Sequence, residues 1–125
     1  MEKKIISTSK APGALGPYSQ AVVVGDVMYC SGQLGLIPET GELAEGVQPQ
    51  AHQSMTNIKN VLAENGMDFS NVVKATIFVK DLANFNAINE VYGSYFTGAY
   101  PARSCVQVAK LPKDAELEIE VLAVR

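Results

Sequence analysis

The sequence of 125 residues has no tryptophan, only one histidine (His52) and only two cysteines (Cys30 and Cys105). Two cysteines without a CxxC pair are too few for a disulfide scaffold, and they fit a reduced intracellular protein. One histidine without a cluster of cysteines cannot build a metal site, so we expect no bound metal. His52 falls within a predicted helix, and we interpret it as an ordinary surface or core residue.

Positive charge is also scarce. The chain has 10 Lys and Arg residues against 13 Asp and Glu residues, which gives a net charge of −3 and an isoelectric point near 5.1. The pair Lys3-Lys4 is the only place where two basic residues adjoin. Proteins that bind nucleic acids take most of their affinity from a basic stripe that neutralises phosphates. We therefore expect no nucleic-acid partner.

Long apolar runs are missing as well. No segment approaches the roughly 18 apolar residues of a transmembrane helix. The N-terminal residues MEKKIIST lack the apolar core of a signal peptide. We therefore expect a cytoplasmic protein that does not enter a membrane.

What the sequence does contain fits a single globular domain over residues 1–125. Its 47% hydrophobic and 18% charged residues are ordinary for a folded protein, and its length is close to the roughly 150 residues typical of one domain. A chain of this size forms a core but has no space for a deep cleft of its own. We therefore expect the site at a cluster of loops or between subunits.

Six segments have the apolar runs or the alternation of β-strands: residues 3–6, 20–24, 27–31, 72–79, 102–109 and 116–124. The Gly25-Asp26 pair between the second and third segments predicts a type II′ hairpin turn. Alternation in the fourth segment assigns four residues to one face: Val73, Ala75, Ile77 and Val79.

Two other segments have helical apolar spacing. A helix is predicted over residues 47–65, from the spacing of Ala51, Met55, Ile58 and Leu62. A second helix is predicted from Asp81 or Asn84, either of which can cap its start, to about Phe96, before Gly98. Its apolar stripe consists of Phe85, Ile88, Val91, Tyr92 and Tyr95.

The resulting order is β-β-β-α-β-α-β-β, in which each helix connects two strands. Right-handed crossovers place both helices on the same side of the sheet. The sequence therefore predicts an α+β two-layer sandwich, with a six-stranded mixed sheet and two helices on one face. The other face has no cover within the chain.

Alternation predicts which side chains lie on the uncovered face. Nine residues are expected there: Arg103, Cys105, Gln107, Glu116, Glu118, Glu120, Phe78, Leu122 and Val124. One interpretation is a sheet with a solvated face. The apolar members favour an interface instead. In that case other copies would cover the face in a closed ring, and the polar residues would meet in clefts between subunits.

Arg103 is the candidate centre of the site. A guanidinium stays charged at any working pH and grips a carboxylate through two parallel hydrogen bonds, which suits a small acid as substrate. The alternative is a salt bridge between Arg103 and a glutamate across the sheet. Glu118 is the candidate acid or base, because a carboxyl whose pKa is raised by burial can activate water. The spacing does not distinguish Glu118 from Glu116 or Glu120.

Three further residues are candidates on weaker patterns. Cys105 is more typical of a small buried thiol than of a nucleophile, since no histidine partner is identifiable. Tyr18 follows a Gly-Pro pair and either presents a directed hydroxyl or packs at a turn. Gly32, at the end of a strand, either allows a ligand to approach the backbone closely or marks a bulge.

The segment at residues 101–119, PARSCVQVAKLPKDAELEI, resembles the C-terminal signature of the Rid family, the reactive intermediate deaminases, also called the YjgF or L-PSP family. The resemblance covers nearly the whole chain, through APGALGPYSQA, SGQLGL, TGEL, FVKDL and the final IEVLAVR. It is strongest to the RidA subgroup. It implies a chorismate-mutase-like fold and a homotrimer, in which three sheets form a central barrel and three sites lie between subunits.

The resemblance also implies an activity. Family members hydrolyse enamines and imines, such as 2-aminoacrylate and 2-iminobutanoate or 2-iminopropanoate, to 2-keto acids and ammonia without a metal or cofactor. Transferred to this sequence, Arg103 would bind the substrate carboxylate, Glu118 would hold and activate the attacking water, and Tyr18 would orient substrate or water. Further contacts would come from the backbone of Cys105 and Gly32 and from Asn89. The loop at residues 97–101 is shorter than in some relatives.

Two other functions are compatible with the residues. A trimer that binds a keto acid through Arg103 without turnover would need no acid beside the arginine. An RNA-cleaving translation inhibitor is the other alternative, which the low isoelectric point and the lack of a pair of histidines disfavour.

Overall fold

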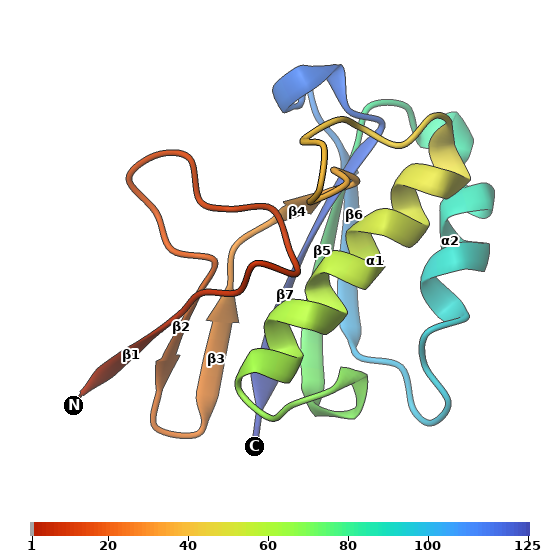
Figure 1. Cartoon of the computed structure of the whole chain (residues 1–125). Coiled ribbons are helices and arrows are strands. Elements are labelled where there is room, and N and C mark those ends of the chain that lie inside the picture. The colour runs from red at the N-terminus through yellow and green to blue at the C-terminus, as the bar shows by residue number, and fades with distance from the viewer. Residues whose placement is uncertain (1) are drawn as a thin grey trace.

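The computed structural model describes residues 2–125 (Figure 1). Within them one sheet contains β1 (Lys3–Ile6), β2 (Ala21–Val24), β3 (Val27–Cys30), β4 (Gln33–Leu34), β5 (Val72–Val79), β6 (Ala102–Gln107) and β7 (Leu117–Val124). The strand order is β1-β2-β3-β7-β5-β6, and β4 also pairs with β7. Only β5 and β6 pair in parallel. The sheet is therefore mixed, as predicted.

The prediction of six strands was wrong by one. The additional strand, β4, has only two residues and lies in a segment rich in glycine and turn residues. Alternation cannot be recognised over so short a stretch. The turn at Gly25 agrees with the predicted type II′ geometry, because Gly25 has a φ of 59° and Asp26 does not have a positive φ.

The helices α1 (Val47–Glu64) and α2 (Phe85–Gly93) pack on the same face of the sheet (Figure 1). Three short 3₁₀ turns accompany them: η1 (Phe69–Asn71), η2 (Leu82–Asn84) and η3 (Pro112–Asp114). The predicted two-layer α+β architecture, with two helices on one face, is confirmed. None of the helices within residues 2–125 is long and apolar enough to cross a lipid bilayer.

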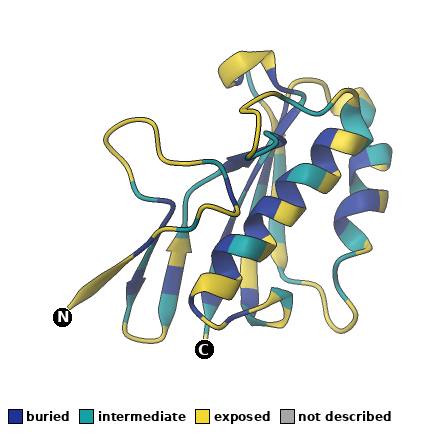
Figure 2. Cartoon of the chain, in the orientation of Figure 1, coloured by how far each residue is buried: buried dark blue, intermediate teal, exposed yellow. Residues whose placement is uncertain are grey.

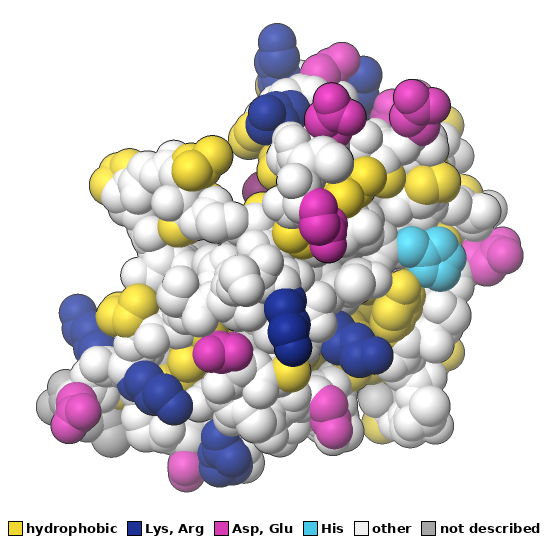
Figure 3. All heavy atoms as spheres, in the orientation of Figure 1, with side chains coloured by type: hydrophobic (Ala, Val, Ile, Leu, Met, Phe, Trp, Pro, Cys, Tyr) yellow, Lys and Arg dark blue, Asp and Glu magenta, His cyan; other side chains and the backbone are white. Residues whose placement is uncertain are grey.

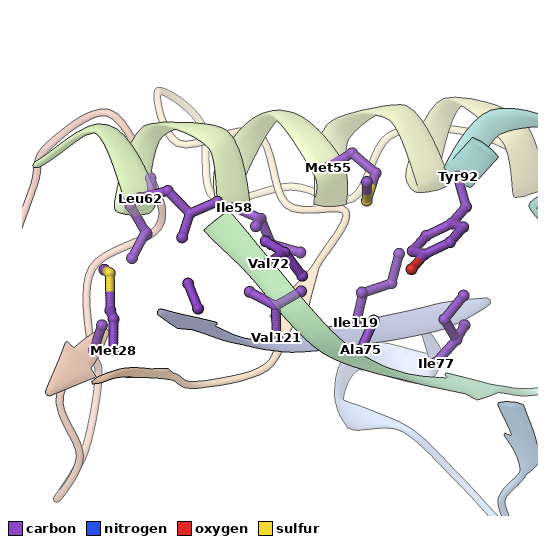
Figure 4. Packing of buried hydrophobic residues seen from close by; sticks show 14 of the residues in the cluster. Met28, Met55, Ile58, Leu62, Val72, Ala75, Ile77, Tyr92, Ile119 and Val121 are labelled. Atoms are coloured by element: carbon purple, nitrogen blue, oxygen red, sulfur yellow. The ribbon is translucent and has the colours of Figure 1, made fainter. Parts of the chain in front are cut away.

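The main core lies between α1, α2 and the sheet, where buried residues of both layers meet (Figure 2). The four positions that predicted the first helix are all buried, which confirms that stripe. Figure 4 shows Met55, Ile58 and Leu62 of α1 pointing toward Val121 and Ile119 of β7. The alternation predicted for β7 is also confirmed, because its odd-numbered residues are buried and its even-numbered residues are partly exposed.

The prediction that the second helix extends to about Phe96 was wrong. The structure ends α2 at Gly93, and the chain continues in a tight turn in which the N–H groups of Ser94, Tyr95 and Phe96 each donate a hydrogen bond to the carbonyl oxygen three residues earlier. Glycine is a weak helix former, and the rings of Tyr95 and Phe96 pack edge-on against Phe69 instead. At the other end, the Asp81 side chain caps η2, and α2 itself begins at Phe85.

The assignment of Val73 to the core face was also wrong. The pairing of β5 with β7 shifts between Val72 and Lys74, as at a β-bulge, which changes the face of the residues before it. Val72 is therefore buried, whereas Val73 is 46% exposed. From Ala75 onward the predicted alternation holds, since Ala75, Ile77 and Val79 are buried.

The face predicted for Arg103, Cys105 and Gln107 was wrong, and this correction moves the candidate site. In the register of β5 with β6, Arg103 lies beside Ala75 and Cys105 beside Ile77. Directly paired residues share a face, so these side chains point to the helix layer. Alternation separates the two faces of an edge strand without indicating which one is covered.

Buried polar residues of α1 form hydrogen bonds to the segment between β3 and α1. Ser54 Oγ and Asn57 Nδ2 donate hydrogen bonds of 2.7 to 3.2 Å to backbone carbonyls of residues 33–36. Gln50 Oε1 accepts one of 2.9 Å from the N–H of Glu116, the residue directly before β7. These bonds satisfy backbone carbonyls of an irregular segment where it lies against the helix.

The close contact of Gly35 with α1 generates a stability prediction. A Cβ at Gly35 would lie 2.5 Å from the Gln50 backbone oxygen, whereas a Cβ at Gly98 would have no neighbour within 4 Å. We expect Gly35→Ala to lower the free energy of unfolding by about 1–3 kcal/mol, because backbone must move to relieve the clash. Gly98→Ala, the matched control, is expected to change it by less than about 0.5 kcal/mol. Urea denaturation measures both, and equal stability of the two variants would contradict the contact.

Candidate active site

Arg103 lies at the start of β6 and is held by three residues of α2. Its Nη1 donates a hydrogen bond of 2.6 Å to Asn89 Oδ1. Its guanidinium carbon lies 5.4 Å from the ring centroid of Phe85 and 5.2 Å from that of Tyr92. Phe85, Asn89 and Tyr92 are spaced by four and three residues, so one face of α2 presents all of them to the guanidinium.

This arrangement orients Arg103 without neutralising it. Among residues 2–125, the ion pair between Lys80 and Asp114 is the only salt bridge, so no carboxylate lies within 4.0 Å of Arg103. The alternative interpretation of Arg103 as the partner of a cross-sheet glutamate is therefore wrong. A neutral amide and two aromatic faces leave its remaining N–H groups and its charge available to an anion. A cavity of about 320 Å³ adjoins it, lined by Asn89, Tyr92, Gly93, Tyr100, Pro101 and Arg103.

Glu118 lies in a different and larger cavity, of about 690 Å³. Three separate segments form its walls: the loop before β2, the segment from β3 to residue 41, and the η3 turn. Figure 3 shows a hollow between the projecting loop and the part of the molecule that contains η3. The lining residues are Pro12, Gly13, Leu15, Tyr18, Ser31, Gly32, Gln33, Leu34, Leu36, Pro38, Gly41, Pro112, Lys113 and Glu118.

Gly32 has a steric role beside Glu118. A Cβ at position 32 would lie 2.8 Å from the Glu118 carboxyl carbon, so a side chain at position 32 would displace the carboxyl from this point. Gly32 was predicted either to let a ligand approach the backbone closely or to mark a bulge. In the structure, the group that lies close to it is the side chain of Glu118 of the same chain. The carboxyl is partly enclosed, and burial, with a smaller contribution from the charge of Glu120, raises the pKa of Glu118.

The structure distinguishes Glu118 from its two neighbours. Glu120 lines another cavity, beside Tyr29, Cys30 and Lys74. Glu116 precedes β7, where its N–H is bound by Gln50. Of the three glutamates that the spacing left equivalent, Glu118 is the one beside Gly32.

The η3 turn, which lines one end of this cavity, has an unusual backbone conformation. Lys113 and Asp114 both have a φ of 56°, in the left-handed region that non-glycine residues rarely adopt. Asp114 forms an ion pair with Lys80, with 3.0 Å between Lys80 Nζ and Asp114 Oδ2. The flanking residues Leu111 and Ala115 are buried. These anchors keep Lys113 at the cavity wall.

Tyr18 and Cys105 have different surroundings. Tyr18 is 54% exposed and lines the Glu118 cavity from the loop before β2. Cys105 packs against the main core from β6. Burial raises the pKa of its thiol, although the charge of Arg103 opposes the effect. A nucleophilic cysteine needs a lowered pKa, so the structure favours a packing role for this thiol.

Within one chain the predicted residues therefore form two groups. Arg103 and Asn89 lie together beside α2, whereas Tyr18, Gly32 and Glu118 line the second cavity. Sequence reasoning missed Phe85 and Tyr92 as partners of Arg103, because both were interpreted as core residues of the helix. Their helical spacing with Asn89 would have identified them, had the face of Arg103 been known.

The chain is similar to known proteins over nearly its whole length. A family model described as Endoribonuclease L-PSP matches residues 8–125. The 2-iminobutanoate/2-iminopropanoate deaminase of Homo sapiens is 48% identical over 124 residues, which are 98% of this chain and 90% of that protein. The crystal structure of E. coli TdcF with bound serine is 49% identical, with a TM-score of 0.95 and 98% of each chain covered. RidA from an Antarctic Psychrobacter is 47% identical, with a TM-score of 0.95 and coverage of 98% of this chain and 99% of that one.

The partly enclosed carboxyl of Glu118 generates a prediction about stability and pH. Its pKa is higher in the folded protein than the ordinary value of 4.5, so the folded state binds a proton more tightly than the unfolded state does. The carboxyl therefore favours folding in acid, and this advantage is lost as the pH rises through the folded pKa. We expect Glu118→Gln to be more stable than the original protein at pH 7.

The difference should disappear below about pH 4.5, where the carboxyl is protonated in both states. Urea denaturation at a series of pH values measures it. Glu39→Gln at an exposed position is the control and should show little change at any pH. A Glu118→Gln variant that is less stable than the original protein at pH 7 would contradict the burial of this carboxyl.

Proposed function

The chain belongs to the endoribonuclease L-PSP family, and its relatives include proteins named 2-iminobutanoate/2-iminopropanoate deaminase and reactive intermediate deaminase. We propose that it is a 2-iminobutanoate/2-iminopropanoate deaminase. The substrates are small imino or enamino acids, including 2-aminoacrylate, and the products are 2-keto acids and ammonia. The observation that carries this proposal is the guanidinium of Arg103, which an amide and two rings orient and no carboxylate neutralises.

The chemistry fits the two groups of residues. An imine carbon is electrophilic, so its hydrolysis needs an anchored carboxylate, a placed water and proton transfer rather than a strong nucleophile. Arg103 and Asn89 bind the substrate carboxylate, with polar contacts from the backbone of Cys105. Glu118, with its raised pKa, holds the water and exchanges protons as the C–O bond forms and ammonia leaves. Tyr18 and the backbone of Gly32 orient the reactants.

We propose further that three copies form a cytoplasmic homotrimer, with each site between two subunits. The uncovered part of the sheet supports this, because Tyr29 and Val106 are 52% and 43% exposed there and Leu122 and Val124 are only partly buried. Phe78 on the same face packs instead against a small cluster of Leu34, Leu111 and Ala115. A partly apolar face of this kind is typical of an interface. The two cavities of one chain support it as well, since Arg103 of one copy and Glu118 of the next then complete one site.

A trimer that only binds keto acids is the second candidate. It would use Arg103 in the same way but would have no need for the partly buried carboxyl beside Gly32. The name of the family model refers to ribonuclease activity. Figure 3 shows Lys and Arg side chains mixed with Asp and Glu on the helix-covered face, without the basic stripe that RNA binding requires.

The role of Arg103 is tested by Arg103→Ala and Arg103→Lys. We expect Arg103→Ala to lower the kcat/KM for imine hydrolysis by about 100-fold or more, because a preorganised contact to the anion is lost. Arg103→Lys keeps the charge without the planar fork and should recover part of the rate. The measurement is imine decay in an assay coupled to an amino-acid oxidase. Unchanged rates in both variants would contradict the assignment, and keto-acid binding without any acceleration would favour the second candidate.

The location of the site between subunits is tested with mixed trimers. Arg103→Ala chains and Glu118→Gln chains are co-expressed with different tags, and trimers containing both are purified on the two tags. We expect about one third of the original activity, since each mixed ring contains one intact site of its three. Trimers of either variant alone are the controls. Mixed trimers as inactive as these controls would place the whole site within one chain.

A further inference from the structure

The loop before β2 projects from the molecule and carries Tyr18. Residues 12–19 of this loop are here called the finger (Figure 1). Figure 2 shows it mostly exposed, and Leu15 at its outer part is 92% exposed. Among residues 13–18, the only backbone hydrogen bond is the one of 2.9 Å from the Tyr18 N–H to the Gly16 oxygen. Hydrogen bonds within the finger therefore do little to fix its orientation.

One buried side chain, Gln20, closes the base of the finger. Its Nε2 donates hydrogen bonds to the backbone oxygens of Thr8, at 3.1 Å, and Pro12, at 2.8 Å. Its Oε1 accepts a hydrogen bond of 2.7 Å from the Thr8 N–H. Gln20 is only 3% exposed, so its amide meets its hydrogen-bonding needs mainly through these backbone groups.

The same residue links the finger to the Glu118 cavity. The Gln20 backbone oxygen accepts a hydrogen bond of 2.9 Å from the Ser31 N–H, directly before Gly32. The side chain of Gln20 thus fastens the incoming end of the loop. The outgoing end is fastened beside Gly32 by the backbone of Gln20 and by a hydrogen bond of 2.6 Å from Ser31 Oγ to the Ser19 oxygen. Tyr18, two residues before Gln20, lines the same cavity.

We propose that Gln20 is a positioning residue of the deaminase, which holds the finger so that Tyr18 closes one wall of the Glu118 cavity. This inference rests on the proposed function. Gln20 does not line the cavity itself and acts through the backbone that it ties. Loss of its bonds frees the finger at its base, and a misplacement of about 1 Å at a reacting group can lower a rate by about 100-fold.

Two substitutions test the clamp. Gln20→Met keeps the length of the side chain and removes all three side-chain bonds. Gln20→Asn keeps a buried amide but shortens it by one methylene, so that it cannot reach both Thr8 and Pro12. Asn60→Ala is the matched control, because Asn60 Nδ2 also donates to the backbone of this loop, at Lys10, outside the finger. Circular dichroism establishes that each variant folds, and Gln20→Asn decides the question where Gln20→Met does not fold.

The first measurement is the NMR order parameter of the backbone amides at residues 13–16, 18 and 19, which needs no activity. We expect these order parameters to fall in both Gln20 variants and to stay unchanged in Asn60→Ala. The second is kcat/KM for imine hydrolysis, which should fall by about 10- to 100-fold in the Gln20 variants. The third combines Gln20→Met with Tyr18→Phe. If Gln20 acts through Tyr18, the double variant should lose little more rate than Tyr18→Phe alone.

The outcomes separate the two proposals. Unchanged order parameters in the finger, or rate losses that simply add in the double variant, would overturn the role of Gln20 while leaving the deaminase activity intact. An original protein that does not accelerate imine hydrolysis would overturn the proposed function and with it the catalytic part of this inference. Lowered order parameters with an unchanged rate would show that the clamp orders the finger but does not serve the reaction, and this result would also overturn the inference.

Discussion

Hydrogen bonds between α1 and the segment from β3 to α1 hold the Glu118 side of the candidate site in place. Buried hydrogen bonds from Ser54 and Asn57 satisfy carbonyls of residues 33–36, and Gln50 binds the start of β7. A buried polar group without a partner is costly, so the segment and the helix must keep one mutual position. Together with the pairing of β4 with β7, in which Leu34 lies opposite Glu118, that position brings Gly32 against Glu118. The hydrophobic core drives the two layers together, but these bonds determine how the segment lies on the helix.

Glycine at two points makes this arrangement possible. Gly35 allows the segment to approach the backbone of α1, and Gly32 leaves space for the carboxyl of Glu118. In both cases another part of the same protein occupies the space that a side chain at the glycine would fill. The Glu118 carboxyl therefore lies partly enclosed in its cavity beside the end of β3, where it can exchange a proton with a bound molecule.

Much of the fold could be predicted from the sequence, because periodicity reports directly on burial. The stripe of α1 and the alternation of β7 correspond to buried positions. The errors arose where a local pattern does not contain the deciding contact. The bulge at Val73 depends on pairing with β7, and the face of Arg103 depends on its parallel register with β5. Residues that touch only in the folded chain, such as Gly32 with Glu118 or Gln20 with Pro12, leave no mark in the spacing of the sequence.

The unneutralised guanidinium of Arg103 also affects how an anion reaches the protein. The chain as a whole has a net charge of −3, so a negatively charged molecule is repelled at long range and attracted only near the cavity. Salt at physiological strength screens charges beyond about 8 Å, which removes most of the distant repulsion but little of the contact at Arg103. Capture is therefore a short-range event, and ionic strength should act mainly on the rate of encounter rather than on the lifetime of the bound state.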